Sequence, residues 1–312
     1  MKVVILGKGE MLSNLIEGVL DAECDIAGVF RYERTTTQNW KLKIKDFFNA
    51  SNDYTIIKQH KLYEIKCRSA NSEKFKKEIL RLNADVILVG TWGEKIKKEI
   101  LDLPVIASVN VHPSFLPNYR GPNPYLQSIL KGETKSGITF HLMDENFDTG
   151  AILAQKQIDI LPNDTSKELK ERTVFQARLM CAEVLKKLEF GLVIPIAQGD
   201  GTYFPNITDD DKMLDFNVES AEQIQRRIRA LHPWLPAYVT YNDKFFIPNP
   251  YKLQVLDVNS NKNIGDIIDT DFKNSSITVL CKDNKALKMD DVKLYGFLNR
   301  PFTKLFIKSI KI

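Results

Sequence analysis

Short, near-continuous apolar runs that alternate with helical patterns constrain the fold of this chain more than any other feature. Residues 84–90 read Ala-Asp-Val-Ile-Leu-Val-Gly, and similar runs occupy residues 3–6, 26–30 and 106–111. Between them, residues 11–20, 72–82 and 94–101 have apolar residues at helical spacing. Strands that are apolar throughout are typical of a parallel sheet covered by helices on both faces. We therefore predict an α/β fold with a doubly wound, mostly parallel sheet, whose ligands bind at the carboxyl ends of the strands.

The pattern changes after residue 135. Residues 138–143 and 151–160 predict two longer strands around a loop. Thr165 and Glu168 have the spacing of a capping box, which predicts a helix that ends near Gly191. The stripe predicted to be buried on this helix comprises Leu169, Val174, Phe175, Leu179, Val184, Leu185 and Leu188.

A second, smaller domain is predicted to follow. Residues 198–211 are rich in Gly, Asp, Asn and Thr, which is typical of a crossing between domains. A helical pattern at 219–231 precedes short strand-like runs at 238–241, 253–258 and 276–281. The sequence thus predicts a first domain over residues 1–205 and a small β-barrel or sandwich over residues 206–312.

Charge and cysteine content exclude several classes of protein. The 44 basic residues exceed the 40 acidic ones by only 4, whereas nucleic-acid-binding proteins usually concentrate positive charge more strongly. No apolar run approaches the roughly 18 residues that a membrane-spanning helix needs. The four cysteines show no CxxC spacing, which favours buried, reduced thiols. We expect a cytoplasmic protein without a membrane partner.

The densest cluster of reactive residues follows the fourth apolar run. Asn110 and His112 are two residues apart in a predicted strand, so their side chains point to the same face. Asp148 lies beside Gly150 in a later turn. Acyl transfer to an amine needs a donor for the oxyanion, a group that takes a proton, and a carboxylate that orients the imidazole. These three residues supply one of each, although a core histidine and a turn aspartate remain the alternative.

The sequence also allows two other classes of site. His112, His141 and Asp148 offer ligands for a metal hydrolase, but they lack tight spacing such as HExxH. We expect no metal, and we expect His141 to pack or hydrogen-bond beside the site. Residues 7–12 contain Gly-x-Gly without the third glycine of a dinucleotide-binding loop, which is a weak signal.

Residues 110–121, together with 137–143 and 148–150, resemble the 10-formyltetrahydrofolate-dependent formyltransferase family. The resemblance implies a doubly wound folate-binding domain and direct transfer of a formyl group to a primary amine, without a covalent enzyme intermediate. It implies that Asn110, His112 and Asp148 are catalytic. It also implies that the folate contacts the loop before Asp148, at Asp144, and a second loop that comprises Gly90, Thr91, Trp92, Gly93 and Glu94.

The later part of the chain also resembles this family. Residues 202–205 and 228–238 are similar to the linker and entry strand of methionyl-tRNA formyltransferases. They are also similar to the formylating half of bacterial enzymes that modify 4-amino-arabinose on a uridine nucleotide. These relatives act on different amines, so the acceptor has to be predicted separately.

Three features favour a nucleotide-linked amino sugar as acceptor. Residues 207–312 hold 16 basic and 14 acidic residues, which is little charge for binding tRNA. Residues 31–45 lack the Gly and Pro of the long basic loop in tRNA enzymes, and they predict a helix from near Gln38. Residues 122–125, Pro-Asn-Pro-Tyr, are similar to those of sugar-nucleotide N-formyltransferases.

The resemblance suggests side chains for this acceptor. We expect Arg120, Asn123 or Tyr125 to approach the sugar or its diphosphate, and Trp40 either to stack on the base or to pack on its own segment. Methionyl-tRNA stays the alternative acceptor, because Lys41, Lys43 and Lys45 offer a local basic patch. The sequence leaves a homodimer open.

Overall fold

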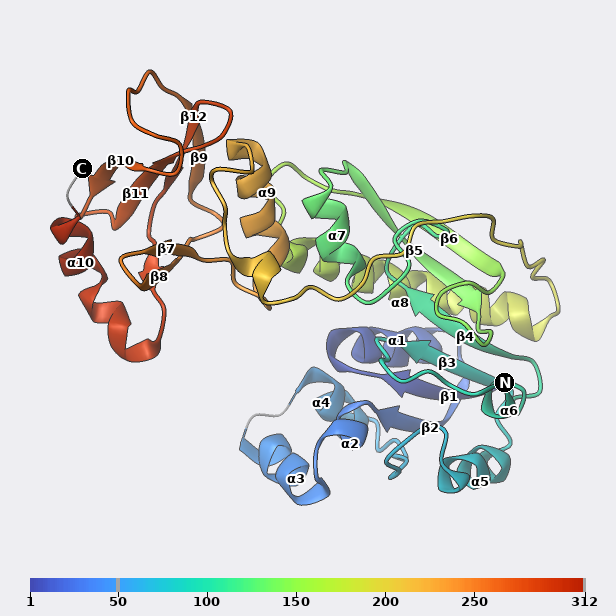
Figure 1. Cartoon of the computed structure of the whole chain (residues 1–312). Helices are drawn as coiled ribbons and strands as arrows, with labels where there is room; N and C mark the ends of the chain where they lie inside the picture. The colour runs from blue at the N-terminus through green and yellow to red at the C-terminus, as the bar shows by residue number, and fades with distance from the viewer. Residues whose placement is uncertain (49–50, 311–312) are drawn as a thin grey trace. The chain divides into compact units, whose positions relative to one another are not determined.

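The computed structural model of the chain describes residues 1–48 and 51–310 (Figure 1). The chain forms two compact units. The first comprises Met1–Pro124, Lys135–Asp159 and Lys170–Pro205, and the second comprises Tyr125–Thr134, Ile160–Leu169 and Asn206–Ile312. The second unit therefore includes two short segments from the first 205 residues. The domain boundary that we predicted after residue 205 stays a prediction.

A six-stranded sheet forms the centre of the first unit, with the strand order β2-β1-β3-β4-β5-β6. The first four of these strands are parallel, whereas β5 and β6 are antiparallel to their neighbours. The predicted mostly parallel sheet is thus a mixed one. Its strands are β1 (Lys2–Gly7), β2 (Asp25–Arg31), β3 (Val86–Gly90), β4 (Ala107–His112), β5 (Lys135–Leu142) and β6 (Ile152–Asp159).

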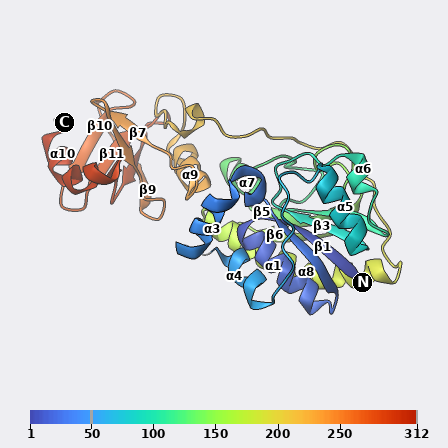
Figure 2. The same cartoon turned by 90° about the horizontal axis from the view of Figure 1, so that it is seen from below.

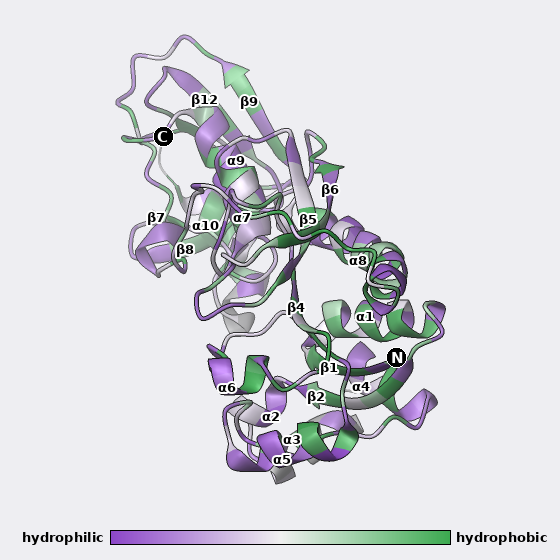
Figure 3. Ribbon diagram, turned by 90° about the vertical axis from the view of Figure 1, so that its right-hand side faces the viewer, coloured by the Kyte–Doolittle hydropathy of each residue, from purple (hydrophilic) through white to green (hydrophobic). Residues whose placement is uncertain are grey.

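Helices cover both faces of this sheet (Figures 1 and 2). On one face lie α1 (Gly9–Asp21) and α8 (Ser166–Glu189), and on the other lie α5 (Glu73–Leu82) and α6 (Lys98–Leu101). Hydrophobic residues run along α1 and β1 in Figure 3. Alternate strand residues such as Val4 and Ile87 pack with Phe75 of α5 in one buried cluster. The predicted helix at 94–101 is shorter than expected, since only its last turn is helical.

Helix α8 buries most of the predicted stripe, including Leu169, Val174, Val184 and Leu185. Phe175 and Leu179 are 57% and 51% exposed, so their assignment to the core was wrong. The buried face of the helix also includes Ala177 and Cys181. Cys181 lies against Gly18 of α1, which allows the two helices to approach closely.

Three helices follow β2: α2 (Glu33–Thr36), α3 (Asn39–Phe48) and α4 (Asn52–Gln59). The helix predicted from near Gln38 is confirmed by α3. The guanidinium of Arg31, which is fully buried, donates to Asp46 of α3 at 2.6 and 3.0 Å and to Glu64 at 2.7 Å. Arg34 also donates to Glu64, at 2.6 and 2.8 Å. These ion pairs hold the segment against the end of β2.

The second unit contains two separate antiparallel sheets, with the strand orders β10-β11-β12-β9 and β13-β8-β7. Within the described ranges, no strand of one sheet pairs with a strand of the other, so the predicted barrel is not closed. The short strand β8 pairs with β7 on one side and with β13 on the other, and none of the three extends the larger sheet. The strands are β7 (Val239–Tyr241), β8 (Lys244–Ile247), β9 (Leu253–Asp257), β10 (Ile267–Asp271), β11 (Ser276–Leu280), β12 (Lys285–Met289) and β13 (Lys293–Leu294).

The helices of the second unit include α7 (Pro124–Leu130), α9 (Ala221–Leu231) and α10 (Thr303–Ser309). Ser220 and Gln223 form a reciprocal capping box at the start of α9. The four cysteines of the chain are free and buried, as predicted. A search of the described residues found no helix with the length and apolar character needed to cross a membrane.

Candidate active site

The candidate active site lies at the carboxyl end of β4. Asn110 and His112 are among the last three residues of this strand, and Asn110 lies opposite His141 of β5 in the antiparallel pairing. Asp148 follows β5 in a loop, and its backbone has a φ of +59°. The structure therefore brings together the three side chains that the sequence predicted to act as a group.

Asp148 contacts both other members of this group. Its Oδ1 atom lies 3.3 Å from His112 Nδ1, and it accepts a hydrogen bond of 3.3 Å from Asn110 Nδ2. Its other oxygen, Oδ2, accepts from the backbone N–H of Gly121 at 3.0 Å. Burial acts to raise the pKa of Asp148, but His112 and the Gly121 N–H outweigh it, so the net pKa is lowered. The carboxylate is thus charged at neutral pH.

Both nitrogens of the buried His112 ring face hydrogen-bond acceptors. Nε2 lies 2.9 Å from the carbonyl oxygen of Tyr119, and Nδ1 faces the Asp148 carboxylate. A neutral imidazole has one N–H and could donate to only one of them, whereas an imidazolium could donate to both. Each ring nitrogen of His112 therefore faces an acceptor to which it could donate.

His141 lies beside Asn110 and hydrogen-bonds there, as predicted. Its Nδ1 lies 2.7 Å from the carbonyl oxygen of Leu142, so Nδ1 carries the ring proton. Burial, followed by the charge of His112, lowers the pKa of His141 to about 4. The ring is neutral at neutral pH, and its Nε2 accepts from Asn110 Nδ2 at 3.1 Å. The amide nitrogen of Asn110, and not its oxygen, therefore faces His141 and Asp148.

A second group of contacts was not predicted from the sequence. Gln198 Nε2 donates to the backbone carbonyls of Asp148 and Gly150, at 3.1 and 2.7 Å. Gln198 is 50 residues from Asp148 along the chain, so no local spacing relates the two residues. The carbonyl of Tyr119 and the N–H of Gly121 were also missed, because a residue type carries no information about backbone groups.

The loop predicted to bind folate is closely packed. A Cβ on Gly90 would lie 2.6 Å from a side-chain carbon of Leu15, so the strand end sits tightly on α1. The ring of Trp92 lies 5.2 Å from Phe30 and 5.0 Å from Tyr32. Its indole Nε1 is buried and has no hydrogen-bond partner among the described residues. Thr91 has a φ of +59°, and Gly93 lies against the Tyr32 hydroxyl.

The two carboxylates predicted near folate hold local structure. Glu94 accepts from the Ser69 hydroxyl, the Ala70 N–H and the Asn71 amide. Asp144 accepts from the Asn146 N–H at 2.8 Å and from the Thr149 hydroxyl at 2.7 Å. Their roles toward folate stay predictions.

The residues predicted to bind the acceptor differ in their surroundings. The Arg120 guanidinium donates to Gln198 Oε1 and to the Gly199 carbonyl, at 2.8 and 3.0 Å. Trp40 is 59% exposed on α3, where its indole donates to Gln38 and Lys41 lies over its ring. Asn123 belongs to the first unit and Tyr125 to the second. The side chains of Lys43 and Lys45 lie outside the described residues.

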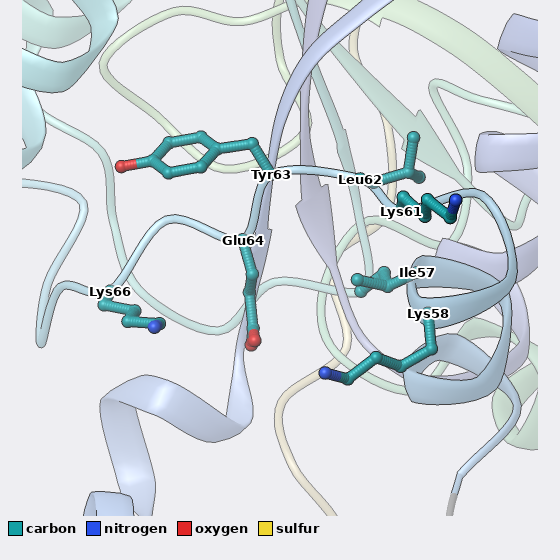
Figure 4. Close-up of a pocket in the computed structure, with 7 residues that line it drawn as sticks. All are labelled: Ile57, Lys58, Lys61, Leu62, Tyr63, Glu64 and Lys66. Atoms are coloured by element: carbon teal, nitrogen blue, oxygen red, sulfur yellow. The ribbon is translucent and has the colours of Figure 1, made fainter.

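A surface pocket of about 520 Å³ lies elsewhere in the first unit (Figure 4). It contains none of the predicted site residues. Its only acidic side chain among the lining residues, Glu64, is already paired with Arg31 and Arg34. The lining comprises Ile57, Lys58, Lys61, Leu62, Tyr63, Glu64 and Lys66.

Comparison with protein families gives two matches. The model described as "Formyl transferase" matches residues 1–185, and "Formyl transferase, C-terminal domain" matches residues 206–296. The chain is 31% identical over 291 residues to a methionyl-tRNA formyltransferase of Clostridioides difficile, covering 92% of this chain and 90% of the relative. It is 30% identical to a methionyl-tRNA formyltransferase of Caldanaerobacter subterraneus, covering 95% of this chain and 93% of the relative.

A solved structure resembles the fold. It is an N-formyltransferase from Helicobacter canadensis in complex with folinic acid and dTDP-3-aminofucose. The TM-score is 0.65 at 19% identity, covering 93% of this chain and 99% of that chain. At this identity the likeness concerns the fold alone.

Proposed function

Because this chain belongs to the formyl transferase family, we propose that it formylates the primary amine of a nucleotide-linked amino sugar. The formyl transfer itself follows from the family, and 10-formyltetrahydrofolate is the co-substrate. The acceptor and the roles of individual residues are the proposal. The observation that supports a sugar nucleotide as the acceptor is that the segment after β2 is helical and that its arginines are paired with carboxylates.

Asn110, His112 and Asp148 would share the chemistry. Asn110 keeps one amide N–H on His141, and its 3.3 Å bond to Asp148 is the longer of the two. That second N–H can therefore turn to the formyl oxygen as negative charge develops there. His112 would relay the proton that the attacking amine loses, and Asp148 would hold the ring and balance its charge. No nucleophilic serine or cysteine is needed, because the formyl group arrives already activated.

The loop after β3 fits a folate. When bound, 10-formyltetrahydrofolate supplies the activated formyl group. The buried Trp92 N–H lacks a partner among the described residues, and a pterin offers ring nitrogens and a carbonyl that accept hydrogen bonds. Trp92 also adds an aromatic wall beside Phe30 and Tyr32. The loop would thus hold the pterin through Trp92 and through its backbone groups.

The segment after β2 favours a small acceptor. In the methionyl-tRNA enzymes that this chain resembles, a long basic loop here meets the acceptor arm. In this chain, Arg31 and Arg34 are buried on Asp46 and Glu64 and are not free for phosphates. Since tRNA binding depends on neutralising many phosphates, the loss of these cations supports the sugar nucleotide.

Methionyl-tRNA is the second candidate acceptor. It is favoured by the relatives of about 30% identity over nine-tenths of the chain, which are named methionyl-tRNA formyltransferases. Lys41 stays exposed on α3 and could contact a phosphate.

A competition assay separates these acceptors. The enzyme would receive 10-formyltetrahydrofolate with a mixture of UDP- and dTDP-linked amino sugars and methionine-charged initiator tRNA. Mass spectrometry would identify the amine that gains the formyl group, and Asn110→Ala would serve as the inactive control. We expect a formylated nucleotide sugar. Formylation of the tRNA alone would overturn the proposed acceptor.

A further inference from the structure

Residues 198–204, which we call the strap, lie between the two segments that match formyl transferase domains. The matches end at residue 185 and resume at residue 206. The strap nevertheless belongs to the first compact unit. It contacts both loops that flank His112, the loop of residues 119–121 and the loop of residues 148–150.

Thr202 and Phe204 fix the first loop. The N–H of Tyr119 donates to the Thr202 hydroxyl, and the N–H of Arg120 donates to the Thr202 carbonyl, both at 2.9 Å. The N–H of Phe204 donates to the Arg120 carbonyl at 3.0 Å, and its ring stacks on that of Tyr119. A Cβ on Gly121 would lie only 2.3 Å from the Phe204 carbonyl, so the loop and the strap are in close contact. These contacts place the Tyr119 carbonyl that His112 faces.

Gln198 fixes the second loop. Its amide N–H groups donate to the carbonyls on either side of Thr149, which belong to Asp148 and Gly150. Its carbonyl oxygen accepts from Arg120, which links the second loop to the first. Asp148 adopts a left-handed φ of +59°, a conformation that costs a non-glycine residue free energy and needs support from its surroundings.

We propose that Gln198 is a positioning residue for formyl transfer, and that Gln198, Thr202 and Phe204 complete the active site by fixing the hydrogen-bond acceptors on both sides of His112. On one side Gln198 holds the backbone from which the Asp148 carboxylate projects. On the other side Thr202 and Phe204 hold the Tyr119 carbonyl. This inference rests on the proposed roles of His112 and Asp148. It also means that the catalytic unit extends beyond the matched residues 1–185.

Gln198→Met in the full chain tests the proposal, because methionine keeps the length of the side chain but removes its hydrogen bonds. We expect kcat to fall roughly 10- to 100-fold while KM for 10-formyltetrahydrofolate changes little, since misplacing a catalytic group costs rate. In an Asp148→Asn background the same substitution should cost almost nothing more, because Gln198 acts through Asp148. Asp200→Ala, an exposed change within the strap, is the matched control and should keep the normal rate.

Hydrogen exchange supplies a readout that does not depend on the acceptor. The Gly121 N–H donates to Asp148 Oδ2, so its exchange should speed up in Gln198→Met and not in Asp200→Ala.

Thr202→Val provides a second variant with the same expected loss of kcat if Gln198→Met does not fold. An unchanged kcat in the folded variant would overturn the proposal. If no acceptor is formylated even by the unaltered enzyme, the proposed function fails, and unchanged Gly121 exchange would then overturn this inference separately.

Discussion

Two strands of the central sheet end in a buried basic residue beside carboxylates, but the two clusters differ in how fully they are paired. Arg31 at the end of β2 makes three hydrogen bonds of 2.6 to 3.0 Å to Asp46 and Glu64. His112 at the end of β4 lies 3.3 Å from Asp148, which also accepts from Asn110. We call the first cluster saturated, because each of its carboxylates is paired with an arginine at 3.0 Å or less, and the second unsaturated, because His112 and Asn110 each lie 3.3 Å from Asp148. Pairing, more than burial, thus separates a structural charge cluster from a chemical one.

Removing the charge from the saturated cluster should have the largest effect, and it should fall on stability. Arg31→Met leaves Asp46 and Glu64 buried with one partner fewer, which we expect to cost about 3–5 kcal/mol of unfolding free energy. Urea denaturation measures this loss. The matched control is Arg81→Met, which breaks a solvent-exposed pair with Glu78 and should cost much less, because water screens that pair. Equal losses in the two variants would erase the contrast between the clusters.

The next largest effect should be kinetic and should come from the unsaturated cluster. Asn110→Ala removes a donor for the developing oxyanion, so kcat should fall roughly 10²–10³-fold while the protein stays folded. Steady-state kinetics with circular dichroism would measure both properties. Asn261→Ala, an exposed change in the second unit, should leave kcat unchanged. Near-normal turnover in Asn110→Ala would remove it from the mechanism.

A pH effect on stability should come from His141. Its pKa is about 4 in the folded chain, against about 6.5 when unfolded, so below pH 6.5 the unfolded chain binds the additional proton. The native state should therefore lose about 2 kcal/mol between pH 7 and 5, and this loss should level off below pH 4. His141→Gln should remove this contribution. Denaturation at both pH values tests it, and an equal pH dependence in the two proteins would contradict the buried, neutral histidine.

The smallest effect is expected from Trp40. Because its side chain is 59% exposed on α3, Trp40→Ala should change the unfolding free energy by no more than about 0.5 kcal/mol. The kcat of the Trp40→Ala variant should stay within about twofold of normal. Its KM for the acceptor should rise only if the Trp40 ring stacks on the base of a bound nucleotide. A large loss of kcat would mean that the segment after β2 takes part in the chemistry after all.

The sequence predicted what short-range patterns control. The strands β1 to β4, the shared face of Asn110 and His112, and the helix after Gln38 all depend on residues that are close along the chain. The barrel was wrong because closure depends on which distant strands pair, and no periodicity specifies that. Phe175 and Leu179 were misassigned because they are apolar, although at 3.6 residues per turn Phe175 lies on the face opposite the buried Val184.

The site was predictable to the same extent. The residue types and their order pointed to Asn110, His112 and Asp148, whose side chains meet. Gln198 could not be found, because its partners are backbone carbonyls 48 and 50 residues away. Arg120, which was predicted with Asn123 or Tyr125 to approach the acceptor, donates to Gln198 and Gly199, and its role toward the acceptor stays a prediction.

The most direct measurement is single-turnover formyl transfer from 10-formyltetrahydrofolate by the unaltered enzyme and by His112→Ala, with the amine identified in the competition assay as acceptor. His112 faces both the Tyr119 carbonyl and Asp148, so removing its ring removes the centre of the proposed proton relay. We predict product from the unaltered enzyme and a rate at least 10²–10³-fold lower in a folded His112→Ala protein, as for the loss of a group acting in the transition state. A variant that transfers formyl at the normal rate would contradict the account.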